Sequence, residues 1–169
     1  MIRCIAAVDS KRGLANDYGM PWQGKIPTDV AHFREKTEGH AVLMGYVTYL
    51  EFAKPLKTRH NYVAAPPGTP PLRAGFEMVQ DLVSFTNNYK DDIDLWIIGG
   101  GGVFAQTIQF ANELYLTELE DDFHCTKFFP EYEKDFELVN KSAPISENDI
   151  TFHFTIWKRI QNTRSQIIL

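Results

Sequence analysis

The stretch Leu95-Trp96-Ile97-Ile98-Gly99-Gly100-Gly101-Gly102-Val103 carries the strongest fold signal in the chain. Its first four residues form a continuous apolar run, which is typical of a strand buried on both faces of a sheet. Four glycines follow at once, and a stretch that favours a helix then runs from Val103 to Phe110. This order permits two interpretations. The glycines form either a tight strand-to-helix turn or a backbone surface that binds phosphate.

Similar apolar runs lie on both sides of this stretch and alternate with segments that favour helices. Strands are predicted at residues 2–8, 41–44, 61–65, 76–79, 113–119 and 152–157, with a long mobile loop at 9–25. Helices are predicted from Pro27 to just before Gly39, at 48–52 and at 81–87. This alternation predicts a three-layer α/β fold around a mostly parallel central sheet. The last two strands have no helix between them and predict an antiparallel edge.

Composition excludes several classes of protein. The chain has 169 residues, a net charge of −5 and scattered cationic residues, which argues for one globular domain and against a general nucleic-acid binder. It contains no apolar run of 18 residues, so no membrane span is predicted. The apolar run at 1–5 is too short for a signal peptide. We therefore expect a cytoplasmic protein in which Cys4 and Cys125 are reduced thiols.

Two features suggest chemistry without deciding it. The glycines do not have the GxGxxG spacing after the first strand, and no Walker lysine follows them, so a simple Rossmann domain and a P-loop enzyme are disfavoured. Asp29 opens an apolar helix just after Met20-Pro21-Trp22. Its carboxylate either caps the helix or is a first-turn anion favoured by the helix dipole, or it faces inward, where it would accept two parallel hydrogen bonds from a flat amidine-like ring.

Taken in order, a set of short motifs resembles the dihydrofolate reductase family. The motifs are Ile5-Ala6-Ala7, Met20-Pro21-Trp22, Asp29, Phe33, Met44-Gly45, Pro55-Leu56, Arg59-His60-Asn61, Ile97-Ile98-Gly99-Gly100, Tyr115-Leu116-Thr117 and Phe129-Pro130. They keep the family's order and spacing over residues 1–159, which predicts one domain there and a tail over residues 160–169. The resemblance implies an eight-stranded mixed sheet flanked by helices, in agreement with the pattern above.

The resemblance also implies an activity. It is the reduction of 7,8-dihydrofolate to 5,6,7,8-tetrahydrofolate by hydride transfer from a reduced nicotinamide cofactor, in support of one-carbon metabolism. The implied partners are dihydrofolate, NADPH and antifolate inhibitors. No nucleic-acid partner, membrane association or metal site is expected, and the protein is expected to be a monomer.

Each family role carries over to a position in this chain. Asp29 would bind the amidine edge of the pteridine, Thr117 would hydrogen-bond that acid, Trp22 would hold a pocket water, and Met20 would centre a lid over the nicotinamide. Arg59 would hold the glutamate α-carboxylate of folate. The implied substrate-binding residues are Ile5, Ala6, Asp29, Val30, Phe33, Phe52, Leu56, Arg59, Ile98 and Thr117. The implied cofactor-binding residues are Ala7, Leu14, Ala15, Met20, Gly45, Tyr46, Val47, Thr48, Ala65, Ile98, Gly99, Gly100, Gly101, Gly102, Val103 and Phe104, with a cis peptide between Gly99 and Gly100.

The departures from the family pattern concentrate on the cofactor phosphates. Tyr46, Ala65-Pro66 and Gly102 stand where the family usually has basic or hydroxyl side chains that hold the 2′-phosphate or pyrophosphate. Phe104 replaces the usual tyrosine after the glycines. In the loops that close the lid, Ala15 replaces a glycine and Cys125-Thr126 replaces Gly-Asp.

These departures leave three outcomes open for the cofactor. Another cation such as Arg73 or Lys57 takes over the missing phosphate contact, NADH serves nearly as well as NADPH, or the protein is a folate-binding relic without activity. A related pterin or pyrimidinone reductase is a further alternative, but a substrate without a glutamyl tail has no need of Arg59. A binder alone does not require the lid and water-holding residues, Met20 and Trp22.

Overall fold

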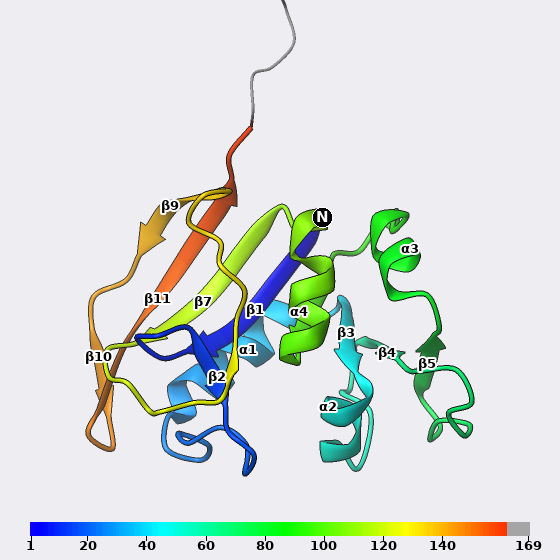
Figure 1. Ribbon diagram of the computed structural model, residues 1–169, viewed down its shortest axis with the longest axis horizontal. Coiled ribbons are helices and arrows are strands. Elements are labelled where there is room, and N and C mark those ends of the chain that lie inside the picture. Colours follow the sequence, from blue (N-terminus) through cyan, green and yellow to red (C-terminus); the bar gives the residue numbers. More distant parts are fainter. Residues whose placement is uncertain (162–169) are drawn as a thin grey trace, which may run out of the picture.

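The computed structural model describes residues 1–161, which form one mixed β-sheet with helices on both faces (Figure 1). The strands lie in the order β10-β11-β7-β1-β6-β3-β4-β5. Every pair from β7 to β5 is parallel, and β11 pairs antiparallel with β7. The parallel strands are β1 (Ile2–Val8), β3 (Ala41–Gly45), β4 (His60–Ala64), β5 (Phe76–Val79), β6 (Leu95–Gly99) and β7 (Glu113–Leu119). The predicted parallel sheet and its antiparallel edge are confirmed.

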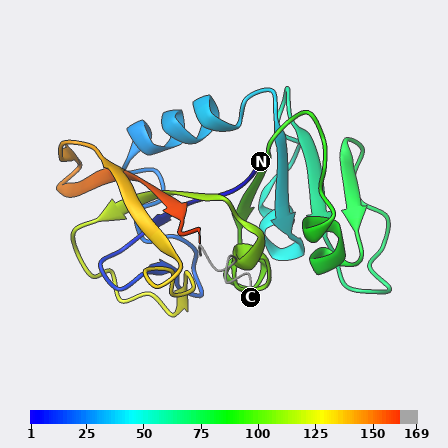
Figure 2. The same ribbon diagram turned by 90° about the horizontal axis from the view of Figure 1, so that it is seen from above.

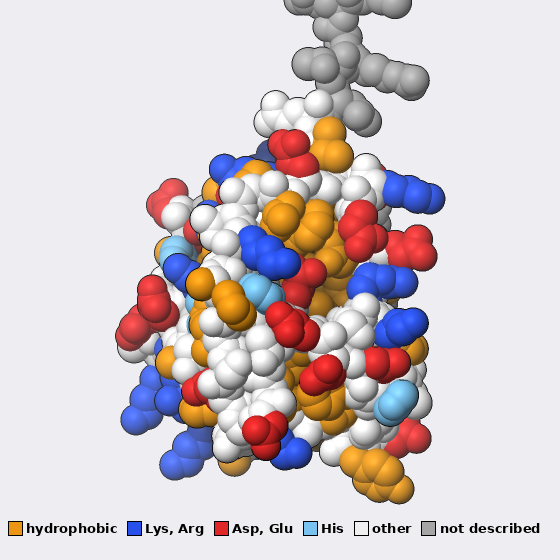
Figure 3. Space-filling view, turned by 90° about the vertical axis from the view of Figure 1, so that its left-hand side faces the viewer, with side chains coloured by type: hydrophobic (Ala, Val, Ile, Leu, Met, Phe, Trp, Pro, Cys, Tyr) orange, Lys and Arg blue, Asp and Glu red, His pale blue; other side chains and the backbone are white. Residues whose placement is uncertain are grey.

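The outer edge is built from two short strands that share one position in the sheet. β9 (Phe136–Lys141) and β10 (Ile145–Glu147) pair with different parts of the long strand β11 (Ile150–Arg159). The sheet is therefore eight strands wide, as the resemblance implies. Figure 3 faces this edge and shows acidic and basic side chains interspersed with hydrophobic ones. Leu138 and Val139 of β9 are each 46% exposed.

Helices cover both faces, which completes the predicted three layers. Figure 2 shows α1 (Pro27–Thr37) on one side of the sheet and α3 (Leu82–Asn87) and α4 (Gly101–Thr107) on the other. Alternate residues of β3 pack toward opposite layers. Val42 and Met44 join a cluster with Phe33 of α1, whereas Leu43 joins a cluster with Phe104 of α4. All three β3 side chains are completely buried, as their unbroken apolar run predicts.

Several boundaries and short strands differ from the sequence-based prediction. The loop expected over residues 9–25 contains strand β2 (Gly13–Ala15), which pairs with β8 (Lys127–Phe128). The helix expected at 48–52 is α2 (Tyr46–Glu51). The helix expected at 103–110 begins at Gly101 and ends as a 3₁₀ turn, Ile108–Phe110. Strands β2, β8, β9 and β10 were not predicted because they are short or largely exposed and so lack a continuous apolar run.

The predicted C-terminal tail falls mostly outside the described residues, which end at Gln161. Ile160 is 42% exposed. Within residues 1–161, no helix is long and apolar enough to cross a membrane. Cys4 and Cys125 are both free thiols and both buried.

Candidate active site

A cavity of about 790 Å³ lies where the carboxyl ends of the central parallel strands meet. β1, β3, β4 and β6 contribute residues to its wall, and helices α2 and α4, strand β2 and the β2–α1 loop close it. This is the edge at which open α/β sheets bind ligands, because the connections after neighbouring strands diverge there. A cavity of this size accommodates a small organic ligand.

The glycine run forms one wall of the cavity. Gly99 has a φ of +132°, a conformation that side chains rarely adopt, and the peptide between Gly99 and Gly100 is cis, as the resemblance implies. A methyl group added at Gly100 would lie 3.7 Å from Thr48 Oγ1 of α2, whereas one at Gly102 would meet nothing within 4 Å. The absence of side chains thus leaves backbone exposed to a ligand along this wall.

All sixteen residues expected to bind cofactor line this one cavity. They come from β1, β2, the β2–α1 loop, β3, α2, the residue after β4, and the glycine run with the flanking ends of β6 and α4. Further lining residues were not predicted, because their places depend on how loops pair and how side chains turn. These are Gly19, Gln23, Glu51, Ala64, Gln80, Leu82, Gln106 and Lys127.

Asp29 does not line this cavity itself, and its carboxylate is held by a hydrogen bond from strand β7. Thr117 Oγ1 of β7 donates a 2.6 Å hydrogen bond to Asp29 Oδ1, and Thr117 is 2% exposed. Helix α1 has no side-chain N-cap hydrogen bond, so Asp29 does not cap it, but Asp29 does lie in the first turn, where the helix dipole favours an anion. Burial raises the pKa of Asp29, and the negative charge of nearby Glu147 raises it further. The hydrogen bond from Thr117 lowers the pKa, but the net effect is an increase. Such a carboxyl retains its proton to higher pH than an exposed aspartate.

Trp22 lies in the core cluster nearest the lid. It is 1% exposed and packs edge-on against Phe123, with ring centroids 5.4 Å apart. Its Nε1 is a buried donor that has no protein partner within the described residues. A buried donor of this kind requires a partner such as a bound water, which is the role the resemblance implies.

The residues expected to bind the rest of the substrate lie on the face of the sheet that α1 covers. Phe33, Phe52, Leu56 and Ile98 are partly exposed and pack against the cluster that contains Ile5. Ala6, Phe52 and Ile98 also line the cavity, so the two expected binding regions are continuous. Val30, on the same helix as Asp29, is 44% exposed.

Arg59 is anchored at the carboxyl end of α1. Its Nε donates to Thr37 Oγ1 at 3.1 Å and its Nη2 to the carbonyl of Arg34 at 2.6 Å. Its Nη1 donates to the carbonyl of Lys57 at 2.7 Å and to Thr58 Oγ1 at 3.2 Å. A guanidinium has five N–H groups, so one remains without a partner among the described residues. A second bond to a carboxylate would need release of the long contact to Thr58.

The loop expected to form the lid, residues 9–25, is tied to the β7–β8 loop despite the substitutions at Ala15, Cys125 and Thr126. The Thr126 amide donates to the Ala15 carbonyl at 2.9 Å, and β2 pairs with β8. Met20, in the same lid, lines the cavity and is 44% exposed. The backbone contacts between the two loops therefore persist without the family's usual side chains.

Asp9 is the carboxylate that joins these two loops. Its Oδ1 accepts from the amides of Lys11 at 2.9 Å and Gly13 at 2.7 Å, and its Oδ2 accepts from the amide of Phe123 at 3.0 Å. Burial raises the pKa of Asp9, but these bonds and one from Cys125 outweigh burial, so the net pKa is lowered. The charged carboxylate thus stabilises the folded lid.

The cavity end expected to receive the 2′-phosphate has no cation in its described lining. Tyr46, Ala65 and Pro66 line it. Arg73 does not line the cavity. Its Nη2 donates to the carbonyls of Tyr49 at 2.8 Å and Phe52 at 2.5 Å, and its guanidinium lies 4.1 Å from the Tyr49 ring centroid. Lys57 does not line the cavity either. The structure therefore does not support the hypothesis that Arg73 or Lys57 replaces the family's usual cation at the cofactor phosphates.

Comparisons with known proteins agree with this geometry. A model of the dihydrofolate reductase family matches residues 1–159. A dihydrofolate reductase of Bacillus subtilis strain 168 is 26% identical over 98% of each chain. One of Haemophilus influenzae is 31% identical over 88% of this chain and 93% of its own length. A protein of Mycoplasmoides gallisepticum named segregation and condensation protein A is 32% identical over 97% of this chain, but the match spans only 27% of that longer protein.

We predict that Asp9→Asn destabilises the protein by about 1–3 kcal/mol at neutral pH, because the amide group cannot accept from every donor that faces it. Urea unfolding of the parent and the variant measures the difference. This stability difference should narrow as the pH falls below the ordinary aspartate pKa, where the unfolded chain gains the proton, and toward the lowered pKa of the folded parent. Asp17→Asn, an exposed change in the same lid, is the control. Equal unfolding midpoints for both variants would contradict the role of Asp9.

Proposed function

Because the chain belongs to the dihydrofolate reductase family, we propose that this oxidoreductase reduces 7,8-dihydrofolate to 5,6,7,8-tetrahydrofolate with NADPH or NADH. The observation that carries the proposal is the pair Asp29–Thr117, in which Thr117 holds a partly buried carboxylate. Thr117 lies opposite Ala7 in the β1–β7 pairing, and Ala7 lines the cavity that the glycines wall. A cationic or amidine-like ring edge is the natural partner of such a carboxylate. The same pairing supports binding of antifolate inhibitors that carry an amidine edge.

The residues divide the work of the reaction between them. Reduced nicotinamide, when bound, supplies the hydride. Asp29 accepts two hydrogen bonds from the pteridine, fixes its orientation and polarises it. The carboxyl group lies at the far edge of the ring from N5, so the proton for N5 arrives through water rather than directly from Asp29. Trp22 Nε1 holds such a water, and the lid around Met20 excludes bulk solvent while the rings align.

The wider assignments belong to the same proposal. The family domain spans residues 1–159, and the protein acts as a cytoplasmic monomer in one-carbon metabolism. Two buried, unpaired cysteines support a reducing compartment. The mixed charges on the β9 edge support the monomer, because interspersed charges discourage association between sheet edges (Figure 3).

We predict that Asp29→Asn lowers kcat/KM for dihydrofolate at neutral pH by roughly 10²–10⁴-fold, the range typical of losing a positioned acid–base group. The amide oxygen still accepts from Thr117, but the side chain can no longer accept two bonds from the pteridine edge. Steady-state oxidation of the nicotinamide cofactor measures the loss. A variant with the parent's kcat/KM would refute the assignment of Asp29.

Stability provides the control for this variant. A carboxyl group with a raised folded-state pKa penalises folding increasingly as the pH rises through that pKa, and the penalty is absent below the unfolded-state pKa. Asp29→Asn should therefore unfold at a higher urea concentration than the parent at pH 7. The difference should shrink toward pH 3. If Asp29→Asn loses activity while its stability is retained or increased, the loss is due to chemistry at the site and not to misfolding.

We predict that Arg59→Lys raises the KM for dihydrofolate by about tenfold or more and changes kcat far less. The guanidinium fork has no equivalent in an ammonium group, and the contact lies far from the reacting carbons. A dihydropterin substrate without the glutamate tail is the matched control, since parent and variant should reduce it equally well. A collapse of kcat at constant KM would instead identify Arg59 as a structural residue.

We predict that the preference for NADPH over NADH is less than about a hundredfold, which corresponds to roughly 2.7 kcal/mol of differential binding. The 2′-phosphate is the only difference between the two cofactors, and Tyr46, Ala65, Pro66 and Gln80 offer it no charge. Cofactor oxidation with dihydrofolate, measured with both cofactors at low and high salt, tests this. A larger preference that shrinks with salt would reveal a cation at the 2′-phosphate. No oxidation of either cofactor would favour the folate-binding relic.

A further inference from the structure

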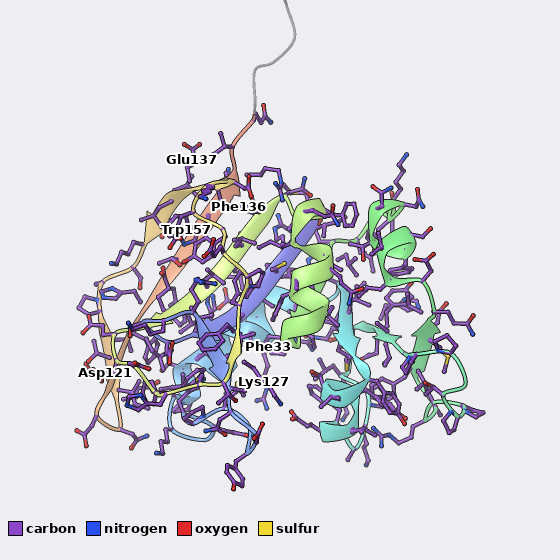
Figure 4. The ribbon with its side chains drawn as sticks, in the orientation of Figure 1. Phe33, Asp121, Lys127, Phe136, Glu137 and Trp157 are labelled. Carbon is purple, nitrogen blue, oxygen red and sulfur yellow. The ribbon has the colours of Figure 1, made fainter. Side chains whose placement is uncertain are left out.

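The described lining of the cavity contains two charged side chains, Glu51 and Lys127. Lys127 is an exposed residue of β8, and its ammonium group has no hydrogen bond or ion pair within residues 1–161. Figure 4 shows Lys127 on β8, near the lid. Its charge is therefore available to a ligand in the cavity.

Two observations place Lys127 beside the glycine run. A methyl group added at Gly101 would lie 3.4 Å from the carbonyl oxygen of Phe128, the residue after Lys127, and 3.7 Å from Leu14 Cδ1 of β2. Lys127 itself lies opposite Ala15 in the β2–β8 pairing. The backbone of β8 thus passes directly against the glycines, and the Lys127 side chain enters the same cavity that they line.

Charge balance indicates what this lysine binds. Every nicotinamide dinucleotide carries a pyrophosphate with two negative charges, whatever group occupies its 2′ position. The glycine wall can offer backbone N–H groups, but the other charged lining residue, Glu51, is repulsive toward a phosphate. A lysine ammonium is a compact charge with three donors, which suits phosphate oxygens.

We propose that Lys127 binds the pyrophosphate of the nicotinamide cofactor and supplies the positive charge that the positions of Tyr46, Ala65, Pro66 and Gly102 lack. The inference rests on the proposed function, since it deepens the description of the same cavity. Lys127 belongs to the strand that pairs with the lid, so the bound cofactor also holds the lid strand β2 against β8. The contact is common to NADH and NADPH and does not discriminate between them.

The test compares Lys127→Gln, Lys127→Arg and the control Lys141→Gln, which removes the same charge from the exposed strand β9. Calorimetric titration with NAD⁺ and with NADP⁺ measures affinity without requiring turnover. Steady-state assays then give KM for NADH, NADPH and dihydrofolate. We expect Lys127→Gln to lower the affinity for both cofactors about tenfold. Lys127→Arg should retain most of the parent's affinity, and Lys141→Gln should retain all of it. The salt dependence of cofactor binding should be smaller in Lys127→Gln than in the parent.

Three results would overturn the proposal. Unchanged affinity for both cofactors would show that Lys127 is a solvated side chain. Weaker binding of NADP⁺ alone in Lys127→Gln would assign Lys127 to the 2′-phosphate instead. A raised KM for dihydrofolate alone would assign it to the substrate. If the parent binds cofactor but never reduces dihydrofolate, the proposed function fails while the titrations still decide the role of Lys127.

Discussion

The hydrogen bond between Thr117 and Asp29 is the contact around which the protein is organised. It joins the first turn of α1 to β7 at 2.6 Å, and it makes a partly buried carboxyl group tolerable. Burial still raises the pKa of that group, so the charged form is unfavourable in the fold. A stability cost at one position is a common property of active sites, because a group suited to its ligand is poorly suited to an apolar interior. The surrounding core, with β3 and β6 covered on both faces, offsets that cost.

The arrangement of strands explains why one cavity collects residues from such distant parts of the chain. Parallel strands end at the same edge of the sheet, and β1, β3, β4 and β6 all deliver residues to the cavity there. The ends of β3 and β6 are glycines, so the wall nearest α4 is mostly backbone. Gly45 illustrates the tightness of this approach, since a methyl group there would lie 2.9 Å from Val103 Cγ2. The lack of side chains at these glycines both exposes backbone to a ligand and lets helix α4 pack closely against β3.

Much of this could be predicted from the sequence, and the exceptions have physical causes. The runs at 41–44 and 95–98 are buried on both faces and therefore show unbroken apolar residues, and the run at 2–8 is interrupted only by Arg3. β9 follows no such pattern, because five of its six residues are exposed. The expected cofactor residues lie together because short motifs fix their places at strand ends. Lys127 was missed because its position depends on the pairing of β8 with β2, two short segments more than a hundred residues apart that carry no mutual signal in the sequence.

The divided outer edge has a consequence for how the protein behaves when crowded. A long, flat edge strand presents a row of free backbone groups that can template fibrils or strand exchange between copies. Here β9 and β10 are separated by Ser142-Ala143-Pro144, and the pairing of β9 with β11 shifts register between Ile156 and Trp157. Proline offers no backbone donor, and the shift twists the ribbon away from flatness. The edge thus resists templated growth even though Leu138 and Val139 remain accessible on it.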